Sequence, residues 1–303
     1  MDSTFSIIIP VFCDPSGLKT TVESILNQDF SKECYEIIIV DNGSTDNTLE
    51  IAKDYARSYP NLISFHEEKE IRSSYAARNK GILSSKGKII AFLDANVSVS
   101  PDYLSKANDV FFVKYQHIQY LGCRVEIVIH NRTISAIYNS AYDFKIGRDI
   151  TENNYSPTCS LIIRKRVIDV VGLFDGRLES GGDWDFGQKV YKAGLKQGYA
   201  DDIIVYHPAR WKYSSLINKS KRVARGIAQM SHYNPTDYNH LFKRYFSLMR
   251  YMPKNPVNIY KYFNYENNLG INYFQSFILS FIHIPIRIIA LYSLVTMKIR
   301  LKT

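Results

Sequence analysis

The stretch Ile38-Ile39-Val40-Asp41-Asn42-Gly43-Ser44-Thr45-Asp46 decides the fold. A run of β-branched residues stops at an aspartate and passes into a polar turn that contains glycine. Similar apolar runs, rich in isoleucine, occupy residues 5–11 and 88–93. Short continuous apolar runs of this kind are typical of strands that are covered on both faces, as in a parallel sheet.

Helical patterns lie between these runs, in residues 16–28 and 46–58, where apolar residues recur on one helix face. Strand, helix and strand at this spacing form a βαβ unit with a right-handed crossover. We therefore expect an α/β fold with a doubly wound, mostly parallel sheet. Ligands of such sheets bind outside the carboxyl ends of the strands.

Acidic and small polar residues stand just after all three predicted strands. Asp14 follows the first, Asp41 the second and Asp94 the third. A single aspartate at such a place is usually a turn former or a helix cap, and Asp46 is expected to cap the next helix. Three such ends at one sheet edge predict a ligand site.

The pattern is less regular after residue 120. Residues 120–129, 159–164 and 203–206 are predicted strands, and 183–193 is a predicted helix. Residues 145–157 are polar and rich in Asn, which predicts a mobile loop.

The composition is that of an ordinary globular protein: 303 residues, 46% hydrophobic and 22% charged. This excludes disordered, collagen-like and coiled-coil chains. The four cysteines are widely spaced, so we expect neither a disulfide framework nor a zinc site, and reduced thiols fit a cytoplasmic protein. The first residues have no basic segment before the apolar run, so no secretory signal is expected.

Positive charge is concentrated at the end of the chain. Residues 208–303 hold 15 Lys and Arg against only Asp237 and Glu266, a net charge of +13, whereas residues 1–207 carry −4. Such asymmetry predicts contact with nucleic acid or with an anionic membrane surface, the alternative being a solvated face. No RNP-like, zinc or helix-turn-helix signature supports nucleic acid, so that partner is not expected.

Six motifs in order resemble glycosyltransferase family 2, whose members have the GT-A fold, a Rossmann-like α/β architecture. They span residues 5 to about 211 and are Ser6-Ile7-Ile8-Ile9-Pro10-Val11, the stretch from Ile38 to Asp46, Ala77-Arg78-Asn79-Lys80-Gly81, Phe92-Leu93-Asp94-Ala95-Asn96, Gly172-Leu173-Phe174-Asp175 and Gly181-Gly182-Asp183-Trp184-Asp185-Phe186. The resemblance implies sugar transfer from a nucleotide-sugar donor to a glycan or lipid-linked acceptor, with inversion at the anomeric carbon.

The resemblance also implies a donor site. Its residues would be Pro10, Val11, Asp14, Asp41, Arg78 and Asp94. The departing diphosphate gains negative charge, which a divalent metal or cations must stabilise. The family's DXD motif falls on Asp94-Ala95-Asn96, so Asp94 and Asn96 would hold Mg²⁺ or Mn²⁺, although Asn96 brings no charge. His207 is a candidate third ligand or else a structural histidine.

Asp183 matches the family's catalytic carboxylate and would take the proton of the acceptor hydroxyl. The glycines before it suggest a backbone shaped around a ligand. Trp184 would present a ring face to a sugar or belong to the core, and Asp185 would bind acceptor or simply begin a helix. Arg210 is a further candidate for the diphosphate.

We expect a catalytic domain over 1–211, with a nucleotide-binding half (1–115) and an acceptor half (116–211), and a basic helical extension over 212–303. Residues 271–297 are mostly apolar but contain Pro285 and Arg287. They predict interfacial helices peripheral on the cytoplasmic face of a membrane, or helices packed on the catalytic domain.

The expected activity is an inverting transferase that uses a UDP- or dTDP-type sugar in cell-surface polysaccharide or glycolipid synthesis. The alternatives are a catalytically inactive nucleotide-sugar-binding scaffold of the same fold and a nucleotidyltransferase. The second would need a glycine-rich phosphate loop near residue 10, and Gly17 is the one glycine there.

Overall fold

The computed structural model describes residues 4–302, which divide into two compact units. The first contains residues up to Glu126, Phe144–Arg177 and Gly182–His207. The second contains Ile127–Asp143, Leu178–Gly181 and the residues from Pro208 onward. The domain boundaries expected from the sequence stay predictions.

An eight-stranded sheet, in the order β3-β2-β1-β4-β7-β6-β8-β5, organises the first unit. Its strands are β1 (Phe5–Val11), β2 (Tyr35–Asp41), β3 (Ile63–Glu67), β4 (Ile89–Phe92), β5 (Ser98–Val99), β6 (Tyr120–Val128), β7 (Leu161–Arg164) and β8 (Gln197–Pro208). The α/β fold is therefore confirmed.

Only half of the sheet is parallel. β1 pairs in parallel with β2 and β4, and β2 with β3. The pairs β4–β7, β6–β7 and β5–β8 are antiparallel. The irregular pattern after residue 120 corresponds to this second half, where β6 is buried only over its first four residues.

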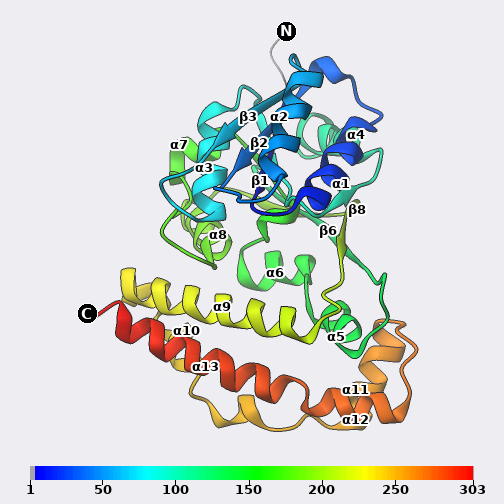
Figure 1. Cartoon of the computed structure of the whole chain (residues 1–303), viewed down its shortest axis with the longest axis vertical. Helices are drawn as coiled ribbons and strands as arrows, with labels where there is room; N and C mark the ends of the chain where they lie inside the picture. The colour runs from blue at the N-terminus through cyan, green and yellow to red at the C-terminus, as the bar shows by residue number, and fades with distance from the viewer. Residues whose placement is uncertain (1–3, 303) are drawn as a thin grey trace. The chain divides into compact units, whose positions relative to one another are not determined.

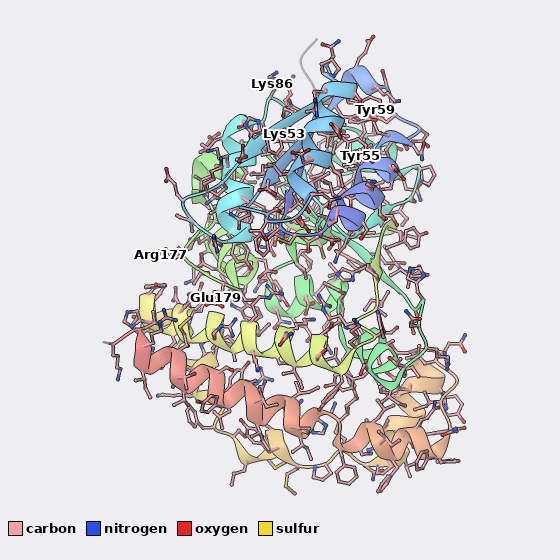
Figure 2. All side chains as sticks on the ribbon, viewed as in Figure 1. Lys53, Tyr55, Tyr59, Lys86, Arg177 and Glu179 are labelled. Carbon is pink, nitrogen blue, oxygen red and sulfur yellow. The ribbon has the colours of Figure 1, made fainter. Side chains whose placement is uncertain are left out.

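Helices flank the sheet in the first unit (Figure 1). They are α1 (Pro15–Leu26), α2 (Thr48–Ser58), α3 (Ser74–Ser84), α4 (Tyr103–Asp109), α6 (Ile146–Asn153), α7 (Arg166–Val171) and α8 (Gly182–Lys192), with the shorter η1 (Lys32–Cys34), η2 (Val110–Lys114) and η3 (Thr158–Ser160). The core joins the isoleucines of β1 and β2 to the apolar faces of α1 and α4. Figure 2 labels Tyr55 on α2, whose hydroxyl donates to Glu23 of α1 (3.3 Å).

The predicted mobile loop at 145–157 is wrong, because its first half is the helix α6. Ile146 and Ile150, four residues apart, form its buried face and pack closely on Gly122 of β6, where a Cβ would lie 2.9 Å from Ile146 and 3.1 Å from Ile150. Asn154 ends the helix in the left-handed conformation (φ 55°). Two apolar residues in a polar segment were too few to reveal the helix.

The second unit is helical. Its elements are α5 (Ile134–Tyr142), α9 (Tyr213–Tyr233), α10 (Pro235–Arg244), α11 (Pro256–Lys261), α12 (Tyr273–Phe281), α13 (His283–Arg300), η4 (Leu248–Tyr251) and η5 (Tyr262–Glu266). α9 and α13 lie side by side (Figure 1), with Ala224 and Ala228 of α9 in one cluster with Ala290 and Leu294 of α13. Small residues at the contact let two helices approach closely.

The segment Tyr273–Arg300 is long and apolar enough to cross a membrane by length and composition, and 39% of its apolar stretch is buried inside the structure. One face of α13 therefore belongs to the core of the second unit. The expected helices at the end of the chain are present, and their contact with a membrane stays a prediction.

Candidate active site

The loops that follow β1, β2 and β4 meet at one edge of the sheet. Val11 pairs with Asp41 in the β1–β2 register, and Ile8 pairs with Phe92 in the β1–β4 register. Pro10 and Val11 are strand residues of β1, and Val11 is 3% exposed. The predicted convergence of strand ends is therefore present in the fold.

Asp41 is buried and uses one carboxylate oxygen to shape its loop. Oδ2 accepts hydrogen bonds from the backbone N–H groups of Gly43 and Ser44, both at 2.9 Å. Gly43 has a φ of +81°, which favours glycine. Oδ1 is also buried and has no hydrogen-bond partner among residues 4–302. A buried carboxylate oxygen without a donor is a natural acceptor for a ligand N–H.

The loop after β1 is tied to the loop after β2. The backbone N–H of Cys13 donates to Ser44 Oγ (2.9 Å), and the N–H of Thr45 donates to Cys13 Sγ (3.4 Å). Asp14 caps α1 by accepting from Gly17 N (2.9 Å). Its carboxylate thus has a structural role, and its contact with a donor stays a prediction. Asp46 accepts from Thr48 N (3.0 Å), but the N-cap of α2 (Thr48–Ser58) is Asn47, so Asp46 forms the turn just before the helix and not its predicted cap.

The Asp94-to-Asn96 segment is held against α1. Thr21 Oγ1 donates to the carbonyl oxygens of Asp94 (3.1 Å) and Val97 (2.7 Å). A Cβ at Gly17 would lie 2.0 Å from the Ala95 carbonyl oxygen, so only glycine permits this approach. Neither Thr21 nor Gly17 was predicted from the sequence to support the site.

Arg78 and Asp94 form an ion pair at this edge. The Arg78 guanidinium donates from NH2 to Asp94 Oδ1 at 2.5 Å, and the side chains are 4% and 38% exposed. Arg78 Nε is buried and has no partner in the described part of the chain. A buried cation therefore lies beside a partly open carboxylate, a suitable arrangement for a diphosphate.

Asn96 and His207 are the other predicted metal ligands. Asn96 Oδ1 is buried and has no hydrogen-bond partner within residues 4–302. The β5–β8 register pairs Ser98 with Tyr206, and continued by one residue it sets His207 opposite Val97, next to Asn96. His207 is buried, with its ring 4.9 Å from that of Phe144.

The described residues contain no group of three or more His, Cys, Asp or Glu that could hold a metal. Mg²⁺ nevertheless commonly binds through one or two carboxylates together with substrate phosphates. One open carboxylate at Asp94 and one orphaned amide oxygen at Asn96 fit such a cation.

Tyr75 connects Arg78 with Asp183. The Arg78 guanidinium lies 5.6 Å from the centre of the Tyr75 ring, and the Tyr75 hydroxyl donates to Asp183 Oδ1 at 3.4 Å. A Cβ at Gly182 would lie 2.9 Å from this ring. The glycine before Asp183 thus makes room for Tyr75, whereas the sequence analysis related it to a ligand. The i, i+3 spacing of Tyr75 and Arg78 on α3 indicates that these two side chains share a helix face, but it does not indicate the contact with Asp183.

The neighbours of Asp183 have separate contacts. Lys189, one turn later on α8, forms an ion pair with Asp185 at 2.6 Å, as expected of an acid at the start of a helix. The Trp184 ring lies 4.8 Å from the ring of Tyr155. Roles of Trp184 and Asp185 toward an acceptor stay predictions.

Asp149 of α6 is a further carboxylate that the sequence analysis missed. Burial raises its pKa, and the negative charge of Asp183 raises it further. The position therefore lies within electrostatic reach of Asp183. Its surrounding segment was interpreted as a loop, which concealed it.

Arg210 belongs to the second unit. Its backbone N–H donates to Asn139 Oδ1 (2.7 Å), and its guanidinium contacts Asp143 at 3.5 Å. Lys219 contacts the same carboxylate at 2.5 Å. A role at the diphosphate stays a prediction.

Known proteins resemble this chain in sequence. "Glycosyltransferase AglE" of Haloferax volcanii is 34% identical over 226 residues, 74% of this chain and 73% of that protein. A Methanococcus voltae "dolichyl N-acetyl-alpha-D-glucosaminyl phosphate 3-beta-D-2,3-diacetamido-2,3-dideoxy-beta-D-glucuronosyltransferase" is 27% identical over 73% of each chain. "Minor teichoic acid biosynthesis protein GgaA" of Bacillus subtilis is 37% identical over 38% of this chain, which is 26% of that protein.

Solved structures share the fold. The Pyrobaculum calidifontis mannosyltransferase PcManGT, in complex with GDP-Man and Mn²⁺, aligns over 98% of this chain and 76% of that one, with a TM-score of 0.56 and 17% identity. Staphylococcus aureus TarS 1-349, in complex with UDP-GlcNAc, aligns over 99% and 91%, with a TM-score of 0.55 and 18% identity. These likenesses confirm the GT-A fold.

The family model "Glycosyl transferase family 2" matches residues 6–170, which include Asp41, Arg78 and the Asp94-to-Asn96 segment. The named relatives support a transferase that uses a nucleotide sugar in glycan synthesis. The chain is a glycosyltransferase, and it belongs to glycosyltransferase family 2.

Proposed function

We propose that this enzyme transfers a sugar, with inversion, from a UDP- or dTDP-sugar to a glycan or lipid-linked acceptor in cell-surface polysaccharide or glycolipid synthesis. This sugar transfer would take place on the cytoplasmic face of a membrane. The relative from Methanococcus voltae, whose name contains a dolichyl phosphate-linked sugar, supports an acceptor of this class.

The observation that carries the proposal is the series of contacts from Asp94 through Arg78 and Tyr75 to Asp183. It joins a carboxylate–guanidinium pair, suited to a diphosphate, to a carboxylate suited to a base. An inverting transferase needs these two groups on opposite sides of the reacting sugar carbon.

In the proposed reaction, Asp183 accepts the proton of the acceptor hydroxyl as its oxygen bonds to the anomeric carbon. The bond from that carbon to the diphosphate breaks, and the nucleoside diphosphate leaves with the electron pair. Tyr75 orients Asp183 through its hydroxyl, and the positive charge of Arg78 stabilises the leaving group.

A divalent cation, when bound, would supply further positive charge to the diphosphate. The chain would hold it through Asp94 and Asn96, with His207 as a candidate third ligand. Arg78 would also orient Asp94 for this purpose.

The preference for a UDP- or dTDP-sugar rests on Asp41. Its unpartnered Oδ1 is an acceptor. Uracil and thymine present an N3–H donor, which matches it, whereas N3 of cytosine is an acceptor and would leave both groups unsatisfied. Such a mismatch between buried polar groups discriminates strongly.

The test is a panel of UDP-, dTDP-, GDP- and CDP-sugars, read by thermal shift, since a bound donor stabilises the fold. In Asp41→Asn the amide oxygen would keep the two backbone N–H groups, and the NH₂ would take the place of Oδ1. We expect wild type to respond to UDP- or dTDP-sugars, and this variant to shift its preference toward CDP.

Asp46→Asn is the matched control, because it makes the same charge change in the same loop and the asparagine amide oxygen can still accept from Thr48 N. An unchanged preference in Asp41→Asn would refute the assignment of the base site. Transfer to an acceptor, measured with and without Mn²⁺, distinguishes an enzyme of weak metal dependence from the inactive scaffold alternative.

A further inference from the structure

A pocket of about 370 Å³ lies within the second unit. Tyr142, at the end of α5, forms one side, and Lys254, Asn255, Asn258, Ile259 and Tyr262 complete the lining. The backbone N–H of Lys254 donates to the Ser280 carbonyl (3.1 Å), which fixes this segment to α12. The pocket is therefore built from several tied elements.

Lys254 extends over an aromatic ring at the pocket. Its Nζ lies 3.9 Å from the centre of the Tyr142 ring, and Tyr262 stacks with that ring at 5.5 Å. A cation above an aromatic ring is held by the ring quadrupole. Asn255 Oδ1 caps α11 by accepting from Val257 N (2.9 Å), which leaves its amide hydrogens as donors to a ligand.

Lys254 is the cation that lines the pocket, and Arg250 and Arg287, which contact each other, lie outside the lining. Lys254, Arg250 and Arg287 form no ion pair with a carboxylate in the described part of the chain. Burial, together with the charge of Arg287, lowers the pKa of Lys254 to about 8. Arg250 Nε is buried and has no hydrogen-bond partner among the described residues. Half-buried cations that destabilise one another favour a bound anion.

The segment around Lys254 and the adjoining helix α12 also expose apolar side chains. Met252 and Val257 flank Lys254 in sequence and are 59% and 51% exposed. Phe277 and Phe281 of α12 are exposed as well, and α12 is joined to α11 by the stacked rings of Tyr260 and Tyr273 (4.2 Å). Apolar side chains beside basic ones are typical of a surface that lies in a membrane interface.

We propose that this pocket binds the phosphate of an anionic membrane phospholipid while Met252, Val257, Phe277 and Phe281 enter the acyl region. The charge of Lys254 and the donors of Asn255 and Asn258 match a phosphate. The inference rests on the membrane contact proposed above. It assigns the attraction between the basic residues and anionic lipid to one defined headgroup site.

The test measures partition of the full chain into vesicles of pure phosphatidylcholine and of phosphatidylcholine with phosphatidylglycerol. Lys254→Met removes the pocket cation and keeps an unbranched side chain. Lys261→Met is the matched control, because it makes the same charge change on exposed α11. One surface lysine accounts for about fivefold in binding to anionic vesicles.

We expect about fivefold weaker binding for Lys261→Met and at least twentyfold for Lys254→Met, with soluble glycerol phosphate competing against wild type only. Equal losses in the two variants would overturn the pocket in favour of diffuse charge. Equal binding of wild type to both vesicle types, or binding to neither, would overturn it too.

Phe277→Gln separates the apolar contribution, since it should weaken binding to both vesicle types by a similar factor. If it weakened neither, the apolar side chains would lie outside the lipid and the proposal would fail. Thermal shift with UDP- and dTDP-sugars on the same variants reports the donor site separately. A normal donor response with no vesicle binding would refute this inference alone.

Discussion

Removal of Asp94 should destabilise the first unit more than removal of its partner Arg78. Asp94→Ala leaves a guanidinium that is 4% exposed without a counter-charge. Breaking a buried pair in this way costs about 3–5 kcal/mol. Because Asp94 is 38% exposed and water can approach the pair, we take the lower end, about 3 kcal/mol.

Arg78→Met removes the buried guanidinium and leaves the carboxylate of Asp94 without its partner. The remaining carboxylate is open enough to be hydrated, the methionine fills the space of the arginine stem, and the unpartnered Nε disappears. The expected loss is within about 1 kcal/mol. The double variant should therefore be about 2 kcal/mol more stable than Asp94→Ala, since the second change removes the stranded charge.

Urea unfolding followed by tryptophan fluorescence measures this difference. The chain has two tryptophans, and a Trp211→Phe background leaves Trp184, in the first unit, as the reporter. At about 2 kcal/mol per molar urea, the midpoint should fall by about 1.5 M in Asp94→Ala and about 0.5 M in the double variant. A double variant less stable than Asp94→Ala would refute the reasoning.

Four shorter predictions follow from the same contacts. Asp183→Asn should lower kcat by about 10²–10⁴ and leave donor affinity within a few fold, and retained turnover would exclude Asp183 as the base. Asn96→Asp should tighten Mn²⁺ binding in the presence of UDP, and unchanged affinity would exclude Asn96 as a ligand. Burial raises the pKa of Asp149, so the folded state holds its proton more tightly than the unfolded chain, and stability falls as pH rises through that pKa. Asp149→Asn should thus raise the Tm at pH 7, with the gain absent below pH 3.8, and a gain that persists there would contradict this. Since burial and Arg287 lower the pKa of Lys254 to about 8, phosphatidylglycerol binding should weaken above pH 8 in wild type and not in Lys254→Met.

The sequence predicted β1, β2 and β4 well because every residue of these strands is buried, whereas β3, buried only at Ile63, was missed. All seven residues of β1 and of β2 are buried, so each strand is mostly apolar, and Ser6 and Glu36, the buried polar exceptions inside these runs, hydrogen-bond to each other. The positions of Asp41 and Asp94 followed from the ends of the apolar runs.

The supporting contacts of the site could not be predicted in the same way. Tyr75 donates to Asp183 across more than a hundred residues of chain, and its ring takes the space that a Cβ at Gly182 would need. No local periodicity in the sequence records such contacts. Gly17 similarly depends on the Ala95 carbonyl. The aspartates could be predicted from their residue type and their position after a strand. The residues that orient them could be identified only from the folded structure.

The sequence left two alternatives for the C-terminal helices, membrane contact or packing inside the protein, and in this structure the two do not exclude each other. Pro285 lies in the first turn of α13, where a missing N–H costs no helical hydrogen bond, so it does not interrupt the helix. Ala290, Leu294 and Met297 recur on the face that packs with α9. Ile288 and Tyr292 recur on another face and are exposed. A helix can therefore pack one apolar face in the core and still expose a second apolar face. A helix that spans a membrane is surrounded by lipid and would not need two separate apolar faces. The membrane contact that we propose is therefore compatible with the packing of α13 against α9.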